Sequence, residues 1–277
     1  MTKILNANLK TGGRMPLLGF GTWDLFGETL EQSLKTALDT GYTHIDTAEG
    51  YQNEGKIGEV LENYDREKLF LASKVLPTNL HYDDVLESLD KSLEKLRTDY
   101  VDLYLIHWPN PAISLRETLH AFAKSFEANK IKNIGVSNFN TYQLKVAQKI
   151  SEVPISVNQL EFHPWYHDQE LFDYCRDNDI TITASAPLAR TKILEDPLIN
   201  ELAEKHEKNP AQVVLRWQIQ QGVATIPKSS SKEHIEENFA AQDFELSSDE
   251  MDRLGKISKD ERAYQIDLDD EIYGIPS

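Results

Sequence analysis

Four ionisable residues in the first half of the chain have types suited to carbonyl chemistry: Asp46, Tyr51, Lys74 and His107. A lysine and an aspartate on neighbouring strands can form a buried ion pair. An ammonium beside a phenol lowers the pKa of the tyrosine from its usual value of about 10, so Tyr51 can serve as a general acid near neutral pH. His107 can donate a hydrogen bond to a substrate oxygen. Together these residues predict a site that polarises and protonates a carbonyl group.

Short apolar segments of the chain, predicted to be buried strands, must position these residues. The runs are rich in Val, Ile or Leu and are bounded by turn-forming residues, as buried parallel strands are. Amphipathic helices are predicted between them, because apolar residues recur there at steps of three and four. Strands that alternate with helices predict a parallel sheet. The eight runs cover residues 17–22, 43–48, 69–75, 101–107, 131–138, 155–161, 180–188 and 222–229.

Eight strand–helix units in about 250 residues predict an α/β fold of the (β/α)8 TIM-barrel type. Residues 4–18 predict an additional N-terminal β-hairpin that turns at residues 11–13 and plugs the bottom of the barrel. A doubly wound sheet is the competing fold. That fold needs a Gly-rich loop that opens a helix, and residues 19–23 lack a third glycine. No linker composition marks a boundary, so we expect a single domain over residues 1–277.

Polar side chains end almost every predicted strand. Asp46, Lys74 and His107 end the second, third and fourth strands, and the later strands end in Ser137, Asn138, Gln159, Ser185, Lys228 and Ser229. Barrel enzymes carry their active sites at the carboxyl ends of the strands. An unpaired charge buried there costs several kcal/mol. A convergent site therefore explains the pattern better than a purely structural ion pair.

The composition excludes several classes of partner. The chain has 46 acidic and 29 basic residues and a formal net charge of −17, and such a surface repels nucleic acid and anionic lipid. No apolar run approaches the roughly 18 residues that span a membrane, and the N-terminal stretch lacks the apolar core of a signal peptide. One cysteine excludes an intramolecular disulfide and a Cys-based zinc site. We expect a cytoplasmic monomer, without a metal, that acts on a small molecule.

Six motifs together resemble the aldo-keto reductases. They are GYTHIDTAEGYQNE (41–54), SKV with Lys74, LYLIHWP with His107, IGVSNFN (134–140), VNQLEFHP (157–164) and IPKSSSKEHIEENF (226–239). They follow the family's order along the chain. The short loop after His107 and the short tail resemble the prokaryotic short-loop members, such as reductases of methylglyoxal or of diketo-sugar acids.

The resemblance implies a barrel that binds NADPH in extended form and reduces aldehydes or ketones to alcohols. It implies that hydride attacks the carbonyl carbon while Tyr51 protonates the oxygen. Lys74, held by Asp46, would tune Tyr51, and His107 would orient the carbonyl. The implied substrate-binding residues are Trp23, His107 and Trp108. The implied cofactor-binding residues are Thr22, Asp46, Ser137, Asn138, Gln159, Ser185, Leu188, Lys228, Ser229, Ser230, His234, Glu237 and Asn238.

The resemblance assigns Lys228 and Ser229 to the adenosine 2′-phosphate. The residues themselves agree, because Ser230 and Glu233 predict a capping box that opens a helix, and a helix N-terminus beside a lysine suits a phosphate. The family usually has arginine at the position of His234. Histidine is mostly neutral at pH 7 and lacks the bidentate fork of arginine, so the NADPH preference should weaken and leave room for NADH.

A second departure from the family lies at Ser185, where the family usually has an aromatic residue that stacks on nicotinamide. Loss of a ring face costs on the order of 1 kcal/mol. We therefore expect looser nicotinamide binding, unless another aromatic side chain fills the gap. Arg190 and Lys192, after the seventh strand, are either contacts for the cofactor diphosphate or solvated surface residues.

Two other functions remain open. One is a Schiff-base aldolase that uses Lys74, which needs a lysine of depressed pKa, whereas Asp46 would raise that pKa. The other is a redox sensor that binds a nicotinamide cofactor and turns over slowly. Ser185 and His234 favour the sensor slightly, and the four catalytic candidates argue against it.

Overall fold

The structure is a computed structural model that describes residues 4–259 and 261–264. The strands of this part are β1 (Asn6–Asn8), β2 (Arg14–Pro16), β3 (Phe20–Gly21), β4 (His44–Asp46), β5 (Phe70–Val75), β6 (Leu103–Ile106), β7 (Ile134–Ser137), β8 (Ile155–Glu161), β9 (Thr181–Ser185) and β10 (Ala224–Thr225). Its α-helices are α1 (Gly27–Thr40), α2 (Glu54–Leu61), α3 (Tyr82–Leu96), α4 (Leu115–Glu127), α5 (Thr141–Ile150), α6 (Gln169–Asp177), α7 (Pro197–Lys205), α8 (Pro210–Gln220), α9 (Lys232–Phe239) and α10 (Ser248–Gly255).

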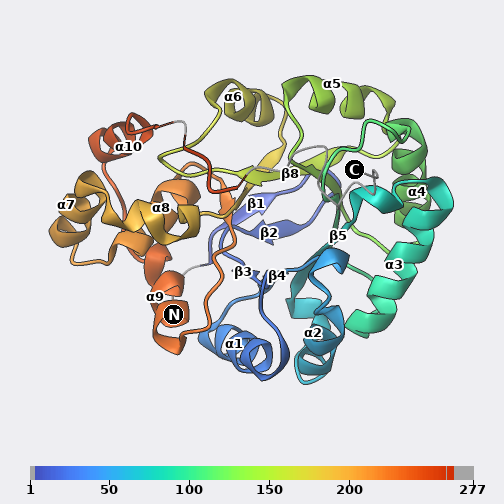
Figure 1. The fold of residues 1–277 in the computed structure, drawn as a ribbon, viewed down its shortest axis with the longest axis horizontal. Coiled ribbons are helices and arrows are strands. Elements are labelled where there is room, and N and C mark those ends of the chain that lie inside the picture. The colour runs from blue at the N-terminus through green and yellow to red at the C-terminus, as the bar shows by residue number, and fades with distance from the viewer. Residues whose placement is uncertain (1–3, 260, 265–277) are drawn as a thin grey trace, which may run out of the picture.

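Strands β3 to β10 form one parallel sheet in chain order, and helices surround it (Figure 1). The last strand returns to the first through a parallel bridge between Leu18 and Thr225. Across this seam the Gly19 amide donates to the Thr225 carbonyl at 2.9 Å, and the Thr225 amide donates to the Leu17 carbonyl at 2.7 Å. The sheet is therefore closed, which confirms the predicted (β/α)8 barrel.

Each predicted apolar run contains one barrel strand. The strands β3 to β8 end within two residues of the end of their runs, whereas β9 and β10 end three and four residues earlier. The strands at the seam are the shortest, with two residues each in β3 and β10. Glycine is required at the end of β3, because a Cβ on Gly21 would lie 2.6 Å from the carbonyl oxygen of Ile226. The long interval after β9 holds two helices, α7 and α8.

Helix α3 buries one apolar face, whereas α8 is buried on nearly all sides from Gln212 to Ile219. In α3 the buried apolar residues are Val85, Leu89, Leu93 and Leu96, which follow the helical period and form a stripe toward the barrel. No helix in the described ranges is long and apolar enough to cross a membrane.

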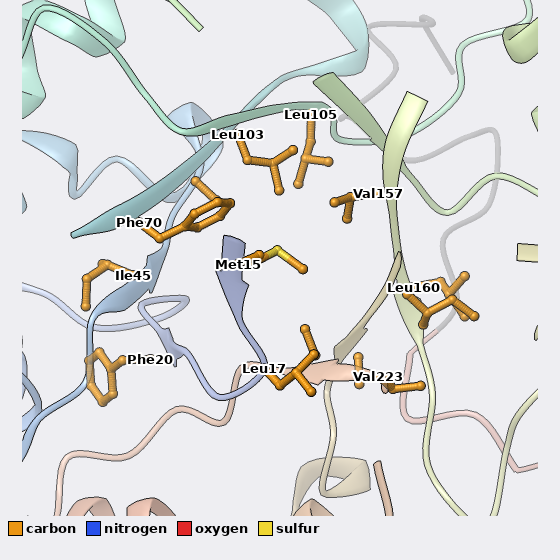
Figure 2. Packing of buried hydrophobic residues seen from close by; sticks show 14 of the residues in the cluster. Met15, Leu17, Phe20, Ile45, Phe70, Leu103, Leu105, Val157, Leu160 and Val223 are labelled. Carbon is orange, nitrogen blue, oxygen red and sulfur yellow. The ribbon is translucent and has the colours of Figure 1, made fainter. Parts of the chain in front are cut away.

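The N-terminal hairpin closes the barrel at the amino ends of its strands. β1 and β2 are antiparallel, and the turn between them contains Gly12 and Gly13, whose φ angles of +98° and +84° lie in the region that favours glycine. Met15 on β2 is fully buried. Figure 2 shows its side chain between those of Phe70, Leu103 and Val157, in the middle of the barrel. The predicted plug is confirmed.

Candidate active site

A buried ion pair lies at the centre of the barrel's carboxyl end. Asp46 pairs in register with Ala72 of the neighbouring strand, so Lys74, two residues on, projects from the same face of the sheet. The Lys74 Nζ lies 2.6 Å from the Asp46 Oδ1, and both side chains are almost wholly buried. The same ammonium donates to the Thr47 carbonyl at 2.8 Å. These bonds supply the partners that a buried charge requires.

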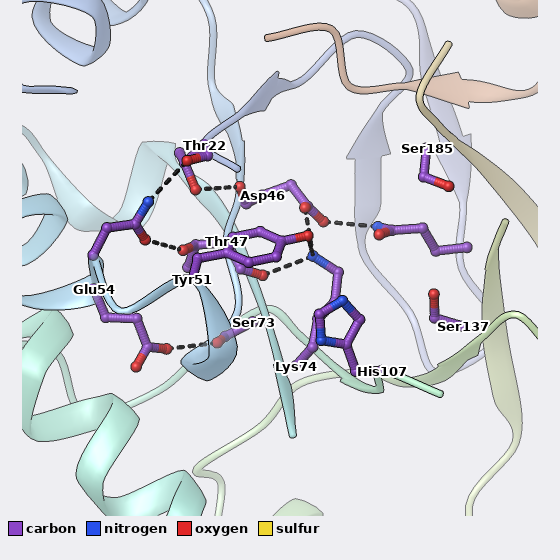
Figure 3. Close-up of polar contacts among 12 residues, drawn as sticks. Thr22, Asp46, Thr47, Tyr51, Glu54, Ser73, Lys74, His107, Ser137 and Ser185 are labelled. Atoms are coloured by element: carbon purple, nitrogen blue, oxygen red, sulfur yellow. Dashed lines mark hydrogen bonds and ion pairs between the residues drawn. The ribbon is translucent and has the colours of Figure 1, made fainter. Parts of the chain in front are cut away.

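The phenol of Tyr51 approaches this ammonium from the loop after β4. A short 3-10 turn, Glu49–Tyr51, carries the residue. Its Oη lies 3.3 Å from the Lys74 Nζ, and its ring meets that of His107 edge to face, with 5.6 Å between the ring centres. Figure 3 shows the Tyr51 hydroxyl, the Lys74 ammonium and the Asp46 carboxylate in one connected cluster beside His107. The sequence prediction that these four side chains converge is consistent with this geometry.

Residues from other parts of the barrel, Gln159 on β8 and Thr22 after β3, contact Asp46. Its Oδ2 accepts a hydrogen bond from the Gln159 Nε2 at 2.8 Å, and its carbonyl accepts one from the Thr22 Oγ1 at 2.9 Å. Both Thr22 and Gln159 were predicted as cofactor-binding residues. In this structure Gln159 also holds the carboxylate that pairs with Lys74, and Thr22 holds the backbone of Asp46.

Two residues that the sequence analysis did not single out complete the support. The Asn53 Nδ2 donates to the Thr22 carbonyl at 2.8 Å, and its Oδ1 accepts from the Thr47 Oγ1 at 3.0 Å. Asn53 therefore ties the loop after β3 to the loop that carries Tyr51. Both Thr47 and Asn53 lie within the motif around Tyr51, and that proximity was the available signal.

Burial sets the protonation states of the cluster. Burial lowers the pKa of Lys74, but the charge of Asp46 and the Tyr51 phenol together outweigh it, so the pKa is raised overall. Burial raises the pKa of Tyr51 and outweighs the opposing ammonium. The lowering expected from the ammonium alone is therefore wrong in sign for the ligand-free protein. Burial, and then the Lys74 charge, lower the pKa of His107 to about 3, so its ring is neutral at neutral pH.

A cavity of about 410 Å³ opens above this cluster. Its walls include Leu76 and Pro77 as well as Trp23 and Trp108, the two predicted substrate-pocket aromatics. Figure 3 shows Ser137 and Ser185 on the side of the cluster opposite Tyr51. The structure thus gathers the following predicted residues around one cavity: Thr22, Trp23, Asp46, Tyr51, His107, Trp108, Ser137, Asn138, Gln159, Ser185 and Lys228.

The remaining predicted cofactor residues lie outside this cavity. Leu188 packs against the hydrophobic core. Ser229 and Ser230 follow Lys228 in the chain, and His234, Glu237 and Asn238 lie on α9. His234 is exposed and Asn238 is buried. Apart from Leu188, these residues lie on the segment from Lys228 to α9, outside the cavity.

The predicted cap of α9 is off by one residue. The helix begins at Lys232, and its N-cap is Ser231, whose side chain accepts from the His234 amide. The Ser229 Oγ accepts from the Ser231 amide at 3.1 Å, which turns the chain before the helix and delays its start. The third residue after this cap is His234, so the capping box predicted from Ser230 and Glu233 does not form.

Two cations converge on one indole at the mouth of the cavity. The Arg190 Cζ lies 5.5 Å and the Lys228 Nζ 5.9 Å from the ring centre of Trp23. Trp23 is half exposed, and Lys228 also pairs with Asp24 at 3.7 Å. In a chain of net charge −17, these two side chains bring positive charge to the mouth of the cavity.

Tyr264 is a cavity residue that the sequence analysis missed. Its Oη lies 2.6 Å from the Ser185 Oγ, and its ring meets Trp108 edge to face at 6.0 Å. An aromatic ring therefore does lie beside Ser185, although it comes from the end of the described chain. No periodicity or motif marks Tyr264 in the sequence, because tertiary docking alone brings it here.

Comparisons with known proteins show the family that this chain resembles. Residues 17–259 match the model of the aldo/keto reductase family. Glyoxal reductase of Bacillus subtilis is 42% identical, with 92% of this chain and 93% of that protein covered. The crystal structure of a thermostable aldo-keto reductase in complex with the inhibitor epalrestat has a TM-score of 0.88 at 41% identity, with 92% of this chain and all of that one covered. The aldose reductase of Schistosoma japonicum has a TM-score of 0.89 at 34% identity, with 98% and 96% covered.

Proposed function

The chain belongs to the aldo/keto reductase family, and from that premise we propose how its residues reduce an aldehyde or ketone to an alcohol. The protein is an oxidoreductase that acts on small carbonyl compounds with a nicotinamide cofactor. The observation that carries the proposed roles is the 3.3 Å contact between the Tyr51 Oη and the ion-paired Lys74 Nζ. It joins a proton donor to a fixed positive charge at the floor of the cavity.

Tyr51 gives its proton to the carbonyl oxygen. Its raised pKa keeps the phenol protonated at neutral pH. As the proton leaves, the Lys74 ammonium stabilises the phenolate, and Asp46 holds that ammonium in place. A charge placed in advance in a buried site costs no reorganisation during the reaction. The reduced nicotinamide, when bound, supplies the hydride that adds to the carbonyl carbon.

His107 orients the carbonyl. Its ring is neutral because burial lowers its pKa to about 3, so one ring nitrogen carries a hydrogen. The Nδ1 is buried and has no hydrogen-bond partner among the described residues. Because the Nδ1 is shielded, the other ring nitrogen, Nε2, is the one proposed to donate to the substrate oxygen, and His107 lines the cavity. This supports a role for His107 in binding the substrate oxygen.

The residues present fit a nicotinamide dinucleotide. Ser137, Asn138 and Gln159 offer hydroxyl and amide groups on one wall of the cavity, which suits a carboxamide. Thr22 and Ser185 lie on the same cavity, and Arg190 and Lys228 bring positive charge to its mouth, which suits the diphosphate and the 2′-phosphate.

The adenosine end extends from Lys228 to α9 in this proposal. Leu188, Ser229, Ser230, His234, Glu237 and Asn238 form that part of the site. NADPH is the proposed cofactor. NADH is proposed as a second one, because the His234 imidazole lacks the bidentate fork with which an arginine pairs with a phosphate.

The proposed substrates are small aldehydes, including dicarbonyl compounds such as methylglyoxal. The name of the Bacillus subtilis relative, glyoxal reductase, supports that class. Trp23, Trp108, Leu76 and Pro77 form apolar walls, so aromatic aldehydes are also proposed substrates.

We further propose that residues 1–277 form one domain and that the protein is a cytoplasmic monomer, which the single cysteine and the high net charge favour.

The aldolase alternative is not favoured. It needs a neutral lysine near pH 7, but the pKa of Lys74 is raised, because Asp46 and Tyr51 outweigh its burial. No observation on the described residues favours a sensor with slow turnover either.

The substitution Tyr51→Phe tests the proposed roles. Because it removes the proton donor, turnover should fall about 100-fold or more, while cofactor binding persists. The assay follows cofactor oxidation by absorbance with methylglyoxal and with an aromatic aldehyde, using NADPH and NADH in parallel. Tyr142→Phe is the matched control, since Tyr142 is 75% exposed. Unchanged turnover in Tyr51→Phe would overturn the assignment of the proton donor.

A further inference from the structure

The end of the described chain enters the cavity. After α10, the Lys259 amide donates to the Trp165 carbonyl at 2.8 Å, and the Lys259 Nζ lies 3.5 Å from the centre of the Trp165 ring. The Ala263 amide then donates to the Glu161 carboxylate. These contacts fix the segment against the loop after β8. We call Ser258, Lys259 and residues 261–264 the C-terminal strap.

Tyr264 at the tip of this strap uses polar groups of the cavity wall. Its Oη lies 2.6 Å from the Ser185 Oγ and also donates a long hydrogen bond of 3.5 Å to the Asn138 Oδ1. The Asn138 Nδ2 is already bonded to the His107 carbonyl at 3.0 Å and to the Ser137 Oγ at 3.1 Å. The Tyr264 hydroxyl therefore occupies the acceptor that Asn138 presents to the cavity.

The wall that Tyr264 contacts is more firmly fixed than the strap. The Asn138 amide donates to the Gln159 carbonyl at 2.8 Å, and Asn138 has a φ of +62°, an uncommon conformation that its surroundings must hold. In the strap, by contrast, Glu261 and Arg262 are exposed, and Ala263 and Tyr264 are only half-buried. If both a ligand and Tyr264 need the Asn138 oxygen, the strap is the element that moves.

We propose that Tyr264 occupies the nicotinamide end of the cofactor site in the ligand-free protein and must leave it when the cofactor binds. This inference rests on the proposed function, in which Ser137, Asn138 and Gln159 hold the carboxamide. A carboxamide N–H donates to the same kind of acceptor that now receives the Tyr264 hydroxyl. The strap thus competes with the cofactor for this site. The apparent dissociation constant of the cofactor equals its intrinsic dissociation constant divided by the fraction of molecules in which the strap is displaced.

Cofactor affinity measured without substrate tests this competition. The dissociation constants of NADPH and NADH are measured by quenching of tryptophan fluorescence for the wild type, Tyr264→Phe and Tyr264→Ala. Tyr264→Phe removes the hydroxyl and should tighten binding about three- to tenfold, the change expected for one lost competing hydrogen bond. Tyr264→Ala should tighten it at least as much. Tyr142→Phe, at an exposed position, is the control. Unchanged or weaker binding in both Tyr264 variants would overturn the proposal.

Tryptic cleavage of the wild-type chain gives a second readout. Arg262 is exposed and precedes the bond to Ala263, whose amide contacts Glu161. Displacement of the strap by NADPH should speed cleavage after Arg262, as followed by mass spectrometry. Protection by NADPH would show instead that the cofactor holds the strap in place, and the proposal would fail.

The two proposals fail in different ways. If the wild type and all variants bind neither cofactor, the proposed function is wrong, and the competition falls with it. If the wild type binds and oxidises the cofactor but the Tyr264 variants bind no more tightly, only the competition is wrong. If Tyr264→Ala alone binds, both proposals are supported.

Discussion

Tyr51 and His107 show how strongly burial controls single residues in this site. From the sequence, the positive charge of Lys74 was predicted to lower the pKa of Tyr51. In the structure burial outweighs that charge, and the pKa of Tyr51 is raised. The effect of burial depends on how many elements surround the side chain, and a sequence does not state that. The direction for Lys74 was predicted correctly because its nearest partner, Asp46, lies on the adjacent strand, and adjacency follows from chain order.

His107 gives a stability prediction at this scale. Its pKa is about 3 in the folded chain, against about 6.5 in an unfolded one. Between these values the unfolded chain binds more protons, so the free energy of unfolding rises with pH by up to about 1.4 kcal/mol per unit. That stability is lost as pH falls below about 6.5. His107→Gln should remove this slope when urea unfolding is measured between pH 4 and 6. Parallel slopes in the two proteins would contradict the assignment.

Among the elements, α10 is joined to the end of α7 by the carboxylate of Glu250. Glu250 completes a capping box with Ser247, and it also accepts from the Lys205 Nζ at 2.7 Å and the His206 Nε2 at 3.0 Å, next to the end of α7. Burial alone would raise its pKa, but the hydrogen bonds from Lys205, Ser247 and His206 outweigh burial and lower it to about 2. α10 leads directly into the strap, so Glu250 also anchors the base of that segment.

Glu250→Gln should lower the free energy of unfolding at pH 7 by about 1–2 kcal/mol. A carboxylate whose folded pKa is depressed contributes stability above its unfolded pKa of about 4.3. That contribution is lost as pH falls toward 2, so the two proteins should converge in acid. Chemical unfolding at several pH values measures this. Glu94→Gln, at an exposed position of α3, should change stability by less than about 0.5 kcal/mol. A constant difference from pH 7 to pH 2 would argue against the pKa assignment.

The elements were largely predictable, since the barrel follows from local signals. Apolar runs, helical spacing and the glycines of the hairpin turn are written in consecutive residues. The cap at Ser231 was missed by one position, because the side-chain bond from Ser229 decides where the turn ends. Tyr264 was missed altogether, because contacts of the strap with Trp165 and Glu161 bring it to the cavity. Contacts between distant segments are what the sequence does not specify.

At the scale of the whole molecule, the net charge of −17 opposes an anionic cofactor. Arg190 and Lys228 attract it only at short range. The Debye length falls from about 30 Å at 0.01 M salt to about 8 Å at 0.15 M, so added salt screens the distant repulsion before the local attraction. The association rate of NADPH, measured by stopped-flow fluorescence, should therefore rise over this range.

NADH is the matched control for this salt effect. It lacks the 2′-phosphate and so carries less negative charge, and its association rate should rise less. An association rate for NADPH that falls with salt would show that Arg190 and Lys228 dominate the field at long range.

The closed seam of the barrel also bears on how the chain is made. Leu18 pairs with Thr225 across the seam. The barrel therefore cannot close during synthesis until some 200 residues after Leu18 have been added, which takes about 10 to 40 seconds at usual rates. Trp23 and Lys228 face each other across the same seam. The nascent protein thus acquires its binding mouth only after Lys228 has been added, and until then the two edges of its sheet stay unpaired and able to pair with other chains.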